Sequence, residues 1–352
     1  MENKTIGGAV IGFGGMGHFH GYQMRKIDGI ELVGVFDIDP EVQKEAEQDG
    51  FHPFDSREAL LSDPAVELVV VATPNDVHKE IVIDALKHGK NVVSEKPVTL
   101  CSADLEEMIA AANKAGKLFT VHQNRRFDGD YLMVRSIIES GVLGDVFRVE
   151  SRVQGSRGIP SGWREVKAQG GGMLLDWGVH MLDQMLYTMD FEAPATVYSV
   201  MTHITNTDCD DGFSVLCKYK NGVEWIIEIQ TNNFIQLPRW YVLGVNGTTL
   251  VEDWDLHGRT VTCTDFSKND SAPIVAGAGI TRTMAPRTDE TIKTIPLPAE
   301  DFPTSWDGYY NNLIDYLNGK GDILVTHDQQ RLLVRVIEAI FESAETGEVV
   351  HL

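Results

Sequence analysis

Two side chains in the sequence have the types and spacing needed for proton transfer. Asp176 and His180 lie four residues apart, so on a helix they would share one face. A histidine titrates near neutral pH and can take a proton from a hydroxyl group, while an aspartate can orient it. A buried histidine capped by a carboxylate would show the same spacing. A metal site that also used Asp183 would lack a convincing fourth ligand.

A lysine stands at a second position where chemistry is expected. Lys96, in Glu95-Lys96-Pro97, directly follows the apolar run Asn91–Ser94. If that run is a strand of an open parallel sheet, Lys96 lies at the carboxyl end of the strand, where ligands bind in such sheets. A partly desolvated lysine there can donate a hydrogen bond to a hydroxyl and stabilise a developing alkoxide. A surface lysine at a turn remains the alternative.

A glycine-rich loop near the start of the chain predicts a phosphate-binding site. The sequence Gly12-Phe13-Gly14-Gly15-Met16-Gly17 fits G-x-G-x-x-G, follows an apolar run and opens a helical pattern. In this motif the first glycine permits the tight turn, the second admits the pyrophosphate and the third allows close helix–strand packing. The loop therefore indicates dinucleotide binding, since the following helix directs its positive end at the phosphates.

The end of the next expected strand indicates whether the chain binds NAD or NADP. Asp37 lies twenty residues after Gly17, where a carboxylate would accept hydrogen bonds from the adenosine ribose. No arginine follows it in Ile38-Asp39-Pro40, so nothing obvious would hold a 2′-phosphate, and NAD is favoured over NADP. His18 and His20 are interpreted as residues on the face of the helix rather than as metal ligands.

The elements that position these residues change character along the chain. Up to about Val121, short apolar runs alternate with helical patterns, which predicts βαβ units around a parallel sheet. The expected strands are Gly8–Gly12, Glu31–Asp37, Leu68–Ala72, Asn91–Glu95 and Leu118–His122. The expected helices are His18–Lys26, Pro40–Asp49, Ser56–Leu61, His78–Lys87 and Ser102–Lys114.

After Asn124 longer β-type runs prevail. A helix over Asp130–Ser140 precedes runs rich in β-branched and aromatic residues: Val146–Gln154, Thr196–Ile204, Phe213–Tyr219, Val223–Thr231 and Trp240–Asp253. The dipeptides Asn221-Gly222 and Asn246-Gly247 predict hairpin turns. Helices over Ser305–Asn318 and Asp328–Glu345 close the chain. We therefore expect an α/β Rossmann domain over residues 1–124, and over 125–352 an α+β domain with a large open, mainly antiparallel sheet.

Composition excludes several classes of protein. The chain has 352 residues, a formal net charge of −22, 43% hydrophobic residues and 4 cysteines. Such an acidic chain disfavours nucleic acid and membrane surfaces as partners. The cysteines form no C-x-x-C pair, so neither a disulfide framework nor a zinc site is expected. No signal peptide or membrane span is expected, and a cytoplasmic location is the default.

Together these motifs resemble the glucose–fructose oxidoreductase/inositol dehydrogenase (Gfo/Idh/MocA) family. The resemblance covers nearly the whole chain and rests on the glycine loop, on Thr73-Pro74-Asn75 with His78, on Glu95-Lys96-Pro97 and on Gly170–Asp183. It implies that Lys96, Asp176 and His180 are catalytic. It also implies a homo-oligomer formed through the outer face of the second sheet. The residues expected at the cofactor are Gly12, Phe13, Gly14, Gly15, Met16, Gly17, Asp37, Thr73, Pro74, Asn75, His78, Glu95, Lys96, Trp163 and Arg164.

The resulting hypothesis is an NAD-dependent dehydrogenase of a sugar, glycoside or cyclitol. A secondary hydroxyl would be oxidised, with glycoside C3 or inositol as attractive targets. Trp163 and Trp177 could stack on a sugar face or pack in the core. The alternatives are a redox-neutral NAD-dependent glycosidase of the same fold, a non-catalytic NAD-sensing regulator, and reduction of an imine or linear tetrapyrrole. Substrate choice would lie in the loops around Gln154–Gln169 and Phe234–Arg239.

Overall fold

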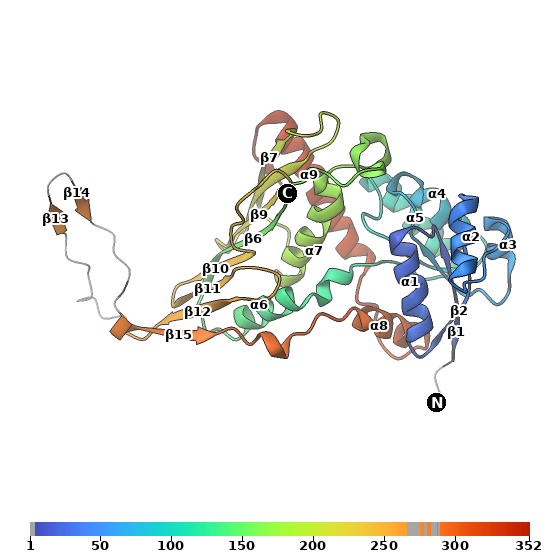
Figure 1. The fold of residues 1–352 in the computed structure, drawn as a ribbon, viewed down its shortest axis with the longest axis horizontal. Helices are drawn as coiled ribbons and strands as arrows, with labels where there is room; N and C mark the ends of the chain where they lie inside the picture. Colours follow the sequence, from blue (N-terminus) through green and yellow to red (C-terminus); the bar gives the residue numbers. More distant parts are fainter. Residues whose placement is uncertain (1–3, 266–274, 278–279, 283–286, 288) are drawn as a thin grey trace.

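The fold is known from a computed structural model, which describes residues 4–265, 275–277, 280–282, 287 and 289–352. Two large sheets lie side by side, with helices between and around them (Figure 1). Among the described residues no helix is both long and apolar enough to cross a membrane. The cysteines Cys101, Cys209, Cys217 and Cys263 are all free.

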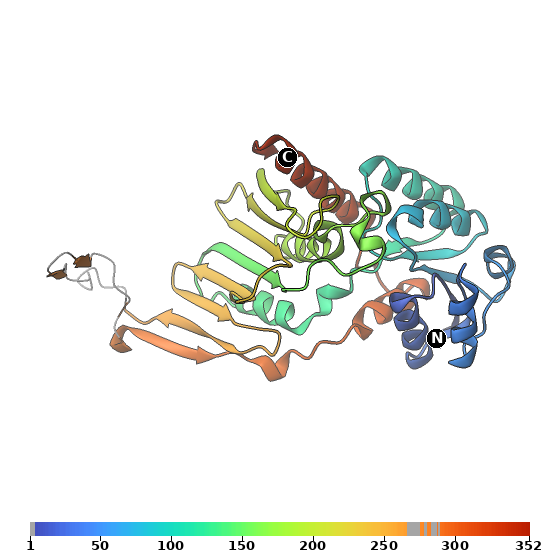
Figure 2. The same cartoon turned by 45° about the horizontal axis from the view of Figure 1, so that its top comes forward.

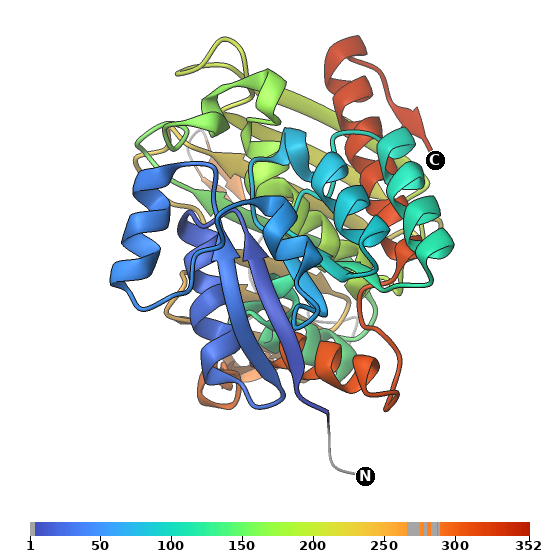
Figure 3. The same cartoon turned by 90° about the vertical axis from the view of Figure 1, so that its right-hand side faces the viewer.

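The first sheet is parallel and has the strand order β2-β1-β3-β4-β5. Its strands are β1 (Ile6–Ile11), β2 (Ile30–Phe36), β3 (Leu68–Val71), β4 (Asn91–Ser94) and β5 (Phe119–Val121). The helices that follow them are α1 (Gly15–Lys26), α2 (Pro40–Gln48), α3 (Arg57–Ser62), α4 (His78–Lys87) and α5 (Ser102–Ala115). Strand β3 is buried along its whole length because helices cover both faces of the sheet, as its continuous apolar run predicts. Figure 3 views this sheet with its helices toward the reader.

The second sheet is mixed and mostly antiparallel. Its order is β15-β12-β11-β10-β6-β9-β8-β7-β16 in the described part of the chain, with only β6 and β9 parallel. Its strands are β6 (Val146–Gln154), β7 (Thr196–Thr202), β8 (Gly212–Lys218), β9 (Glu224–Gln230), β10 (Trp240–Gly244), β11 (Gly247–Val251), β12 (Gly258–Cys263), β15 (Ile292–Pro296) and β16 (Val350–His351). A separate short hairpin pairs β13 (Val275–Gly277) with β14 (Ile280–Arg282). Both predicted hairpins are confirmed, β8 with β9 around Asn221-Gly222 and β10 with β11 around Asn246, although Gly247 already begins β11 and the turn is Val245-Asn246.

One face of the second sheet is covered by helices. Helices α6 (Gly129–Glu139), α7 (Val179–Thr188) and α9 (His327–Thr346) lie on the side of the sheet that is turned toward the first domain (Figure 1). Trp225 and Trp240 are fully buried in the core beneath them, so these two aromatic residues serve packing. Tyr241 is half-buried in its strand, and Phe234 is exposed in a loop. Figure 2 gives a second view of the sheet with these helices on one side.

The last helices return toward the first domain. Tyr309, Tyr310 and Leu313 of α8 (Asp307–Leu317) belong to the same hydrophobic core as the parallel sheet. The predicted fold class is therefore confirmed: a Rossmann-like parallel sheet followed by a large, mainly antiparallel sheet. The pattern-based expectations omitted β12, β15 and β16; β15 and β16 are the two edge strands of the second sheet, and β12 pairs with β15.

Candidate active site

A cleft of about 740 Å³ runs along the carboxyl ends of the parallel strands. It begins at Asp37 after β2, passes Gly12 after β1 and Thr73 after β3, and ends at Lys96 after β4. Of the expected cofactor residues, the lining includes Gly12, Gly14, Gly15, Met16, Asp37, Thr73, Pro74, Asn75, Glu95, Lys96, Trp163 and Arg164. The volume is within the range of ligand pockets, and the position is the one that open parallel sheets use for dinucleotides.

The glycine loop has the shape that a pyrophosphate requires. Gly12 has a φ of +86°, and a Cβ there would lie 2.7 Å from the backbone of Ala72. A Cβ on Gly17 would collide with the carbonyl oxygen of Gly12, so this glycine permits the close packing of α1 on β1. Around Gly14 and Gly15 there is open space, and α1 starts without a side-chain cap. These residues therefore fit NAD, because the backbone N–H groups of the helix start can meet its phosphates.

Asp37 has a second task beside the one predicted from its position. Its Oδ2 accepts a hydrogen bond of 2.6 Å from the Phe13 N–H, and its Oδ1 accepts one of 2.9 Å from the Asp39 N–H. The carboxylate thus ties the glycine loop to the end of β2. Nearby, the cleft is also lined by Arg57 and Glu80, which form an ion pair of 2.9 Å with each other. No local sequence pattern marks these two residues, because they come from α3 and α4.

Within the described part of the chain, three of the residues expected at the cofactor do not line the cleft. Phe13 is buried, and Gly17 acts through helix packing. His78 is buried as well. Its ring nitrogens lie 2.9 Å from the Thr73 carbonyl and 3.1 Å from the Pro97 carbonyl, so it connects the two loops that shape the cleft.

At the inner end of the cleft, Asp176 bridges two cations. Lys96 Nζ lies 2.9 Å from the Asp176 carbonyl oxygen and 3.4 Å from its Oδ1. Arg164 Nε lies 3.1 Å from Oδ2 of the same carboxylate. Asp176 therefore orients Lys96 and Arg164. The expected bond from Asp176 to His180 is not found in the described part of the chain. The reason is that Asp176 belongs to a π-helical turn, Leu174–Gly178, which has more residues per turn than an α-helix and so changes the register before α7.

His180 lies in the first turn of α7, 5% exposed. Its Nδ1 is buried and has no hydrogen-bond partner within the described residues. Burial, together with the charges of Lys96 and Arg125, holds the pKa of His180 well below its usual 6.5. The imidazole is therefore neutral at pH 7 and has a bare nitrogen that can accept a proton. The Trp177 ring lies 6.2 Å from the His180 ring, and Arg125 stacks 4.1 Å from the Trp177 ring centre.

A carboxylate that the sequence reading missed holds the start of this helix. Oδ2 of Asp210, which is 3% exposed, accepts a hydrogen bond of 2.8 Å from the Leu174 N–H. The Asp210 carbonyl accepts another of 3.0 Å from the Met173 N–H. Burial raises the pKa of Asp210 from 3.8 to about 7. Asp210 thus fixes the segment that carries Asp176.

This raised pKa predicts a pH-dependent stability. Between pH 3.8 and about 7 the folded chain keeps a proton on Asp210 that the unfolded chain has lost, so this group's contribution to stability falls as the pH rises. Asp210→Asn keeps the acceptor for the Leu174 N–H and stays neutral. We expect the melting temperature of the variant minus that of the wild type to rise from pH 4 to pH 7. Above pH 7 this difference should stay constant. Thermal melts of both proteins across that range provide the measurement, and a pH-independent difference would contradict the assignment.

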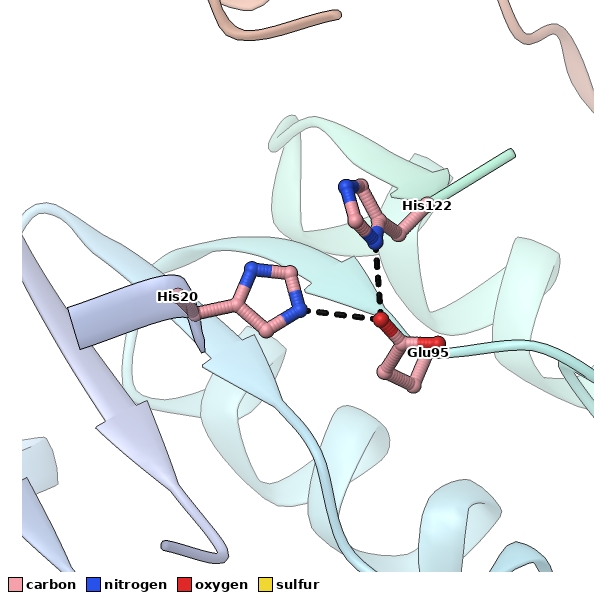
Figure 4. Close-up of side chains that lie close together, drawn as sticks. All are labelled: His20, Glu95 and His122. Atoms are coloured by element: carbon pink, nitrogen blue, oxygen red, sulfur yellow. Dashed lines mark hydrogen bonds and ion pairs between the residues drawn. The ribbon is translucent and has the colours of Figure 1, made fainter. Parts of the chain in front are cut away.

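Two further buried groups lie behind the site. His20 lies on helix α1, as interpreted, and is wholly buried there. Its Nε2 lies 2.9 Å from Oε1 of Glu95 (Figure 4). Asp183 is paired with the buried Arg126 through bonds of 2.7 Å to Nε and NH2, so it is not available as a metal ligand beside His180. Neither pairing is visible in the sequence, because the partners are 57 or more residues apart.

Comparison with known proteins shows the same two parts. The model of an oxidoreductase family with an NAD-binding Rossmann fold matches residues 6–123, and the model of the GFO/IDH/MocA C-terminal domain matches residues 131–250. The scyllo-inositol 2-dehydrogenase (NADP(+)) IolW of Bacillus subtilis is 27% identical, and the alignment covers 99% of this chain and 96% of that protein. The D-glucoside 3-dehydrogenase of Escherichia coli is 25% identical, with 100% and 99% covered.

Among solved structures, an NAD-binding protein from Listeria innocua is 42% identical and superposes with a TM-score of 0.88. That match covers 99% of this chain and 97% of the other. The arrangement of the two domains thus occurs in a related protein as well. The chain belongs to the Gfo/Idh/MocA family of NAD-binding oxidoreductases.

Proposed function

We propose that this oxidoreductase oxidises a secondary hydroxyl of a sugar, glycoside or cyclitol and passes the hydride to NAD. The observation that carries the proposal is the inner end of the cleft. There Lys96 and Arg164 converge on Asp176, and a buried neutral histidine follows one turn later. A lysine and a histidine beside a hydride acceptor are the groups that alcohol oxidation needs. The relatives named for inositol and glucoside dehydrogenation support a polyol as the substrate class.

Each residue has a defined task in this reaction. NAD bound in the cleft would supply the acceptor for the hydride. The bare ring nitrogen of His180 takes the hydroxyl proton, and the Lys96 ammonium donates a hydrogen bond to the oxygen as it becomes negative. Asp176 keeps Lys96 in place through the contact to its carbonyl oxygen. Burial of His180 excludes water from the proton acceptor.

The test is the appearance of NADH when the pure protein is mixed with NAD and a panel of glucosides, free hexoses and inositols. NADH that forms with one group of substrates supports the proposal and names the class. Silence across the panel would contradict it. Release of an aglycone without net NADH would instead indicate the redox-neutral glycosidase, and binding of NAD without any turnover would indicate a sensor.

The cofactor preference is a separate prediction. The acidic residues Asp37 and Asp76 line the cleft, and Arg57 is already paired with Glu80 and Asp84. A 2′-phosphate would therefore meet negative charge, and we expect NAD to bind at least about tenfold more tightly than NADP. Asp37→Asn keeps an acceptor for the Phe13 N–H but removes the charge. It should therefore reduce the difference in affinity between NAD and NADP. Titration calorimetry with both cofactors decides, and equal binding by the wild type would refute the preference.

We further propose that the uncovered face of the second sheet associates with a second copy of the chain. Direct strand pairing aligns a row of side chains on this face: Tyr198, Leu216, Ile226, Glu150, Tyr241 and Leu250. Tyr198 and Val200 of β7 are 41% and 49% exposed, an unusual amount of apolar surface for a strand face. Light scattering should find an oligomer that Tyr198→Glu with Val200→Glu converts to a smaller species. A monomeric wild type would contradict the proposal.

A further inference from the structure

A buried hydrogen-bonded cluster lies directly behind Lys96. Glu95 is 5% exposed, and its Oε1 lies 2.9 Å from His20 Nε2 and 2.7 Å from His122 Nδ1 (Figure 4). Its Oε2 accepts a hydrogen bond of 3.0 Å from the backbone N–H of Lys96. Both histidines are wholly buried, and they come from α1 and from the end of β5. A fourth residue, Tyr310 of α8, hydrogen-bonds to Nδ1 of His20.

The arrangement of these hydrogen bonds fits an anionic Glu95. An ionised carboxylate only accepts hydrogen bonds, so His20 and His122 donate to it, and the Tyr310 hydroxyl can donate to the other nitrogen of His20. Burial opposes the ionisation of Glu95, but His122 and His20 outweigh it and hold the pKa of this carboxyl well below 4.5. Burial lowers the pKa of His20 to about 4, so this ring is neutral at pH 7. Glu95 therefore keeps its negative charge although it is buried.

Glu95 is also one of the residues that line the cleft. Glu95 and Lys96 form its inner end together with Arg164. Lys96 and Arg164 share a single carboxylate, that of Asp176, so the paired groups at this end carry an excess of positive charge. The nicotinamide ring is cationic in NAD⁺ and neutral in NADH. A cationic ring placed there would be repelled unless another anion stood close by.

We propose that Glu95, fixed by His20 and His122, is the counter-charge that favours the oxidised over the reduced nicotinamide in this cleft. The inference rests on the proposed function in one respect, namely that the nicotinamide occupies the Lys96 end of the cleft. During turnover a hydride with its electron pair leaves the substrate carbon for the ring, and the hydroxyl proton leaves for His180. The ring's charge disappears in that step, so the fixed charge of Glu95 sets how far the equilibrium on the enzyme lies toward NADH.

The test compares the dissociation constants of NAD⁺ and NADH in titrations without substrate. Glu95→Gln preserves the shape of the side chain and removes its charge. We expect the ratio Kd(NAD⁺)/Kd(NADH) to rise about tenfold, the effect of a unit charge roughly 10 Å away at an effective dielectric constant of about 20. Glu80→Gln is the matched control, because this carboxylate lines the same cleft but its side chain is 70% exposed. Its ratio should equal that of the wild type, since water screens the charge.

Two other measurements keep the proposal open to refutation if Glu95→Gln folds poorly. His20→Asn removes a donor but leaves the carboxylate, so the ratio should stay closer to the wild-type value than in Glu95→Gln. The wild type itself should bind NAD⁺ at least as tightly as NADH. Equal weakening of both forms in Glu95→Gln, or a wild type that strongly prefers NADH, would overturn the proposal.

Elemental analysis adds one more check. The ring nitrogens and the carboxylate oxygen of the cluster are close enough together for a metal ion. A tightly bound transition metal in each purified chain would replace the hydrogen bonds described above and overturn the proposal. Failure of the inference is distinguishable from failure of the proposed function, because the titrations need no substrate and the search for NADH formation needs no variant.

Discussion

His180→Asn should lower turnover by about 10²- to 10⁴-fold, the usual contribution of a general base. The imidazole lies outside the lining of the cleft in the described structure, so NAD affinity should change by no more than about twofold, as expected for a group that acts only in the chemical step. Steady-state kinetics and NAD titration of the same preparation separate the two effects. Equal losses of turnover and of NAD affinity would contradict the role as base.

The matched control for this variant is His351→Ala. His351 is an exposed histidine in the edge strand β16, in the second domain like His180. Its replacement should leave turnover unchanged. If both variants lost activity alike, the loss would reflect a general sensitivity of the second domain to substitution.

The depressed pKa of His180 also predicts the shape of the pH profile. A histidine with a lowered pKa stays neutral, and so able to accept a proton, below its usual 6.5, and it loses this capacity only when the pH falls through the lowered value. The acid limb of kcat/KM should therefore lie clearly below pH 6.5 in the wild type. A limb at or above that value would show that Lys96 and Arg125 do not act on this ring.

Asp183→Ala should destabilise the folded chain by about 3–5 kcal/mol, because it leaves the buried guanidinium of Arg126 without its counter-charge. Arg126 and Asp183 have side chains that are 1% and 2% exposed, and they are joined by two hydrogen bonds of 2.7 Å. Arg126 also donates to the Leu324 carbonyl and to Oε1 of Gln329, so it connects α7 with the segment that leads into α9. Urea unfolding measures the loss directly.

A second variant tests the reason for that loss. Replacing both partners together, as in Arg126→Met with Asp183→Leu, removes the stranded charge and should recover much of the stability lost in Asp183→Ala. Asp183 lies one turn after His180 on α7, so the single variant should also lose turnover. A loss of stability below about 1 kcal/mol in Asp183→Ala would show that the pair acts as an exposed salt bridge does.

The sequence predicts the local elements well because their patterns are local. The ranges Val146–Gln154 and His78–Lys87 coincide with β6 and α4, since a period of two residues and an apolar helical face are both visible in a few residues. The glycine loop can be predicted equally well, because the backbone conformation of the motif requires glycine at these positions. The edge strand β15 and its neighbour β12 carry weaker patterns and acquire their structure from their neighbours in the sheet.

The surroundings of the site could not be predicted in the same way. His20 appears in the sequence as an ordinary helix residue, and only the fold brings it to Glu95, 75 positions away. Asp210 reaches the start of the helical turn before His180 from a loop 36 positions further along the chain. Such contacts depend on how the elements are packed. The sequence indicates which residues can perform the chemistry, and the fold shows which groups set their charges.

The most direct test of the central claim follows the hydride itself. The protein is incubated with NAD and with glucosides and inositols that carry deuterium on their ring carbons, and the mass of the nicotinamide cofactor is measured. We expect reduced cofactor that has gained one deuterium from one of these substrates, and no such product from the His180→Asn variant. Bound NAD whose mass never changes, with or without cleavage of the glycoside, would contradict it.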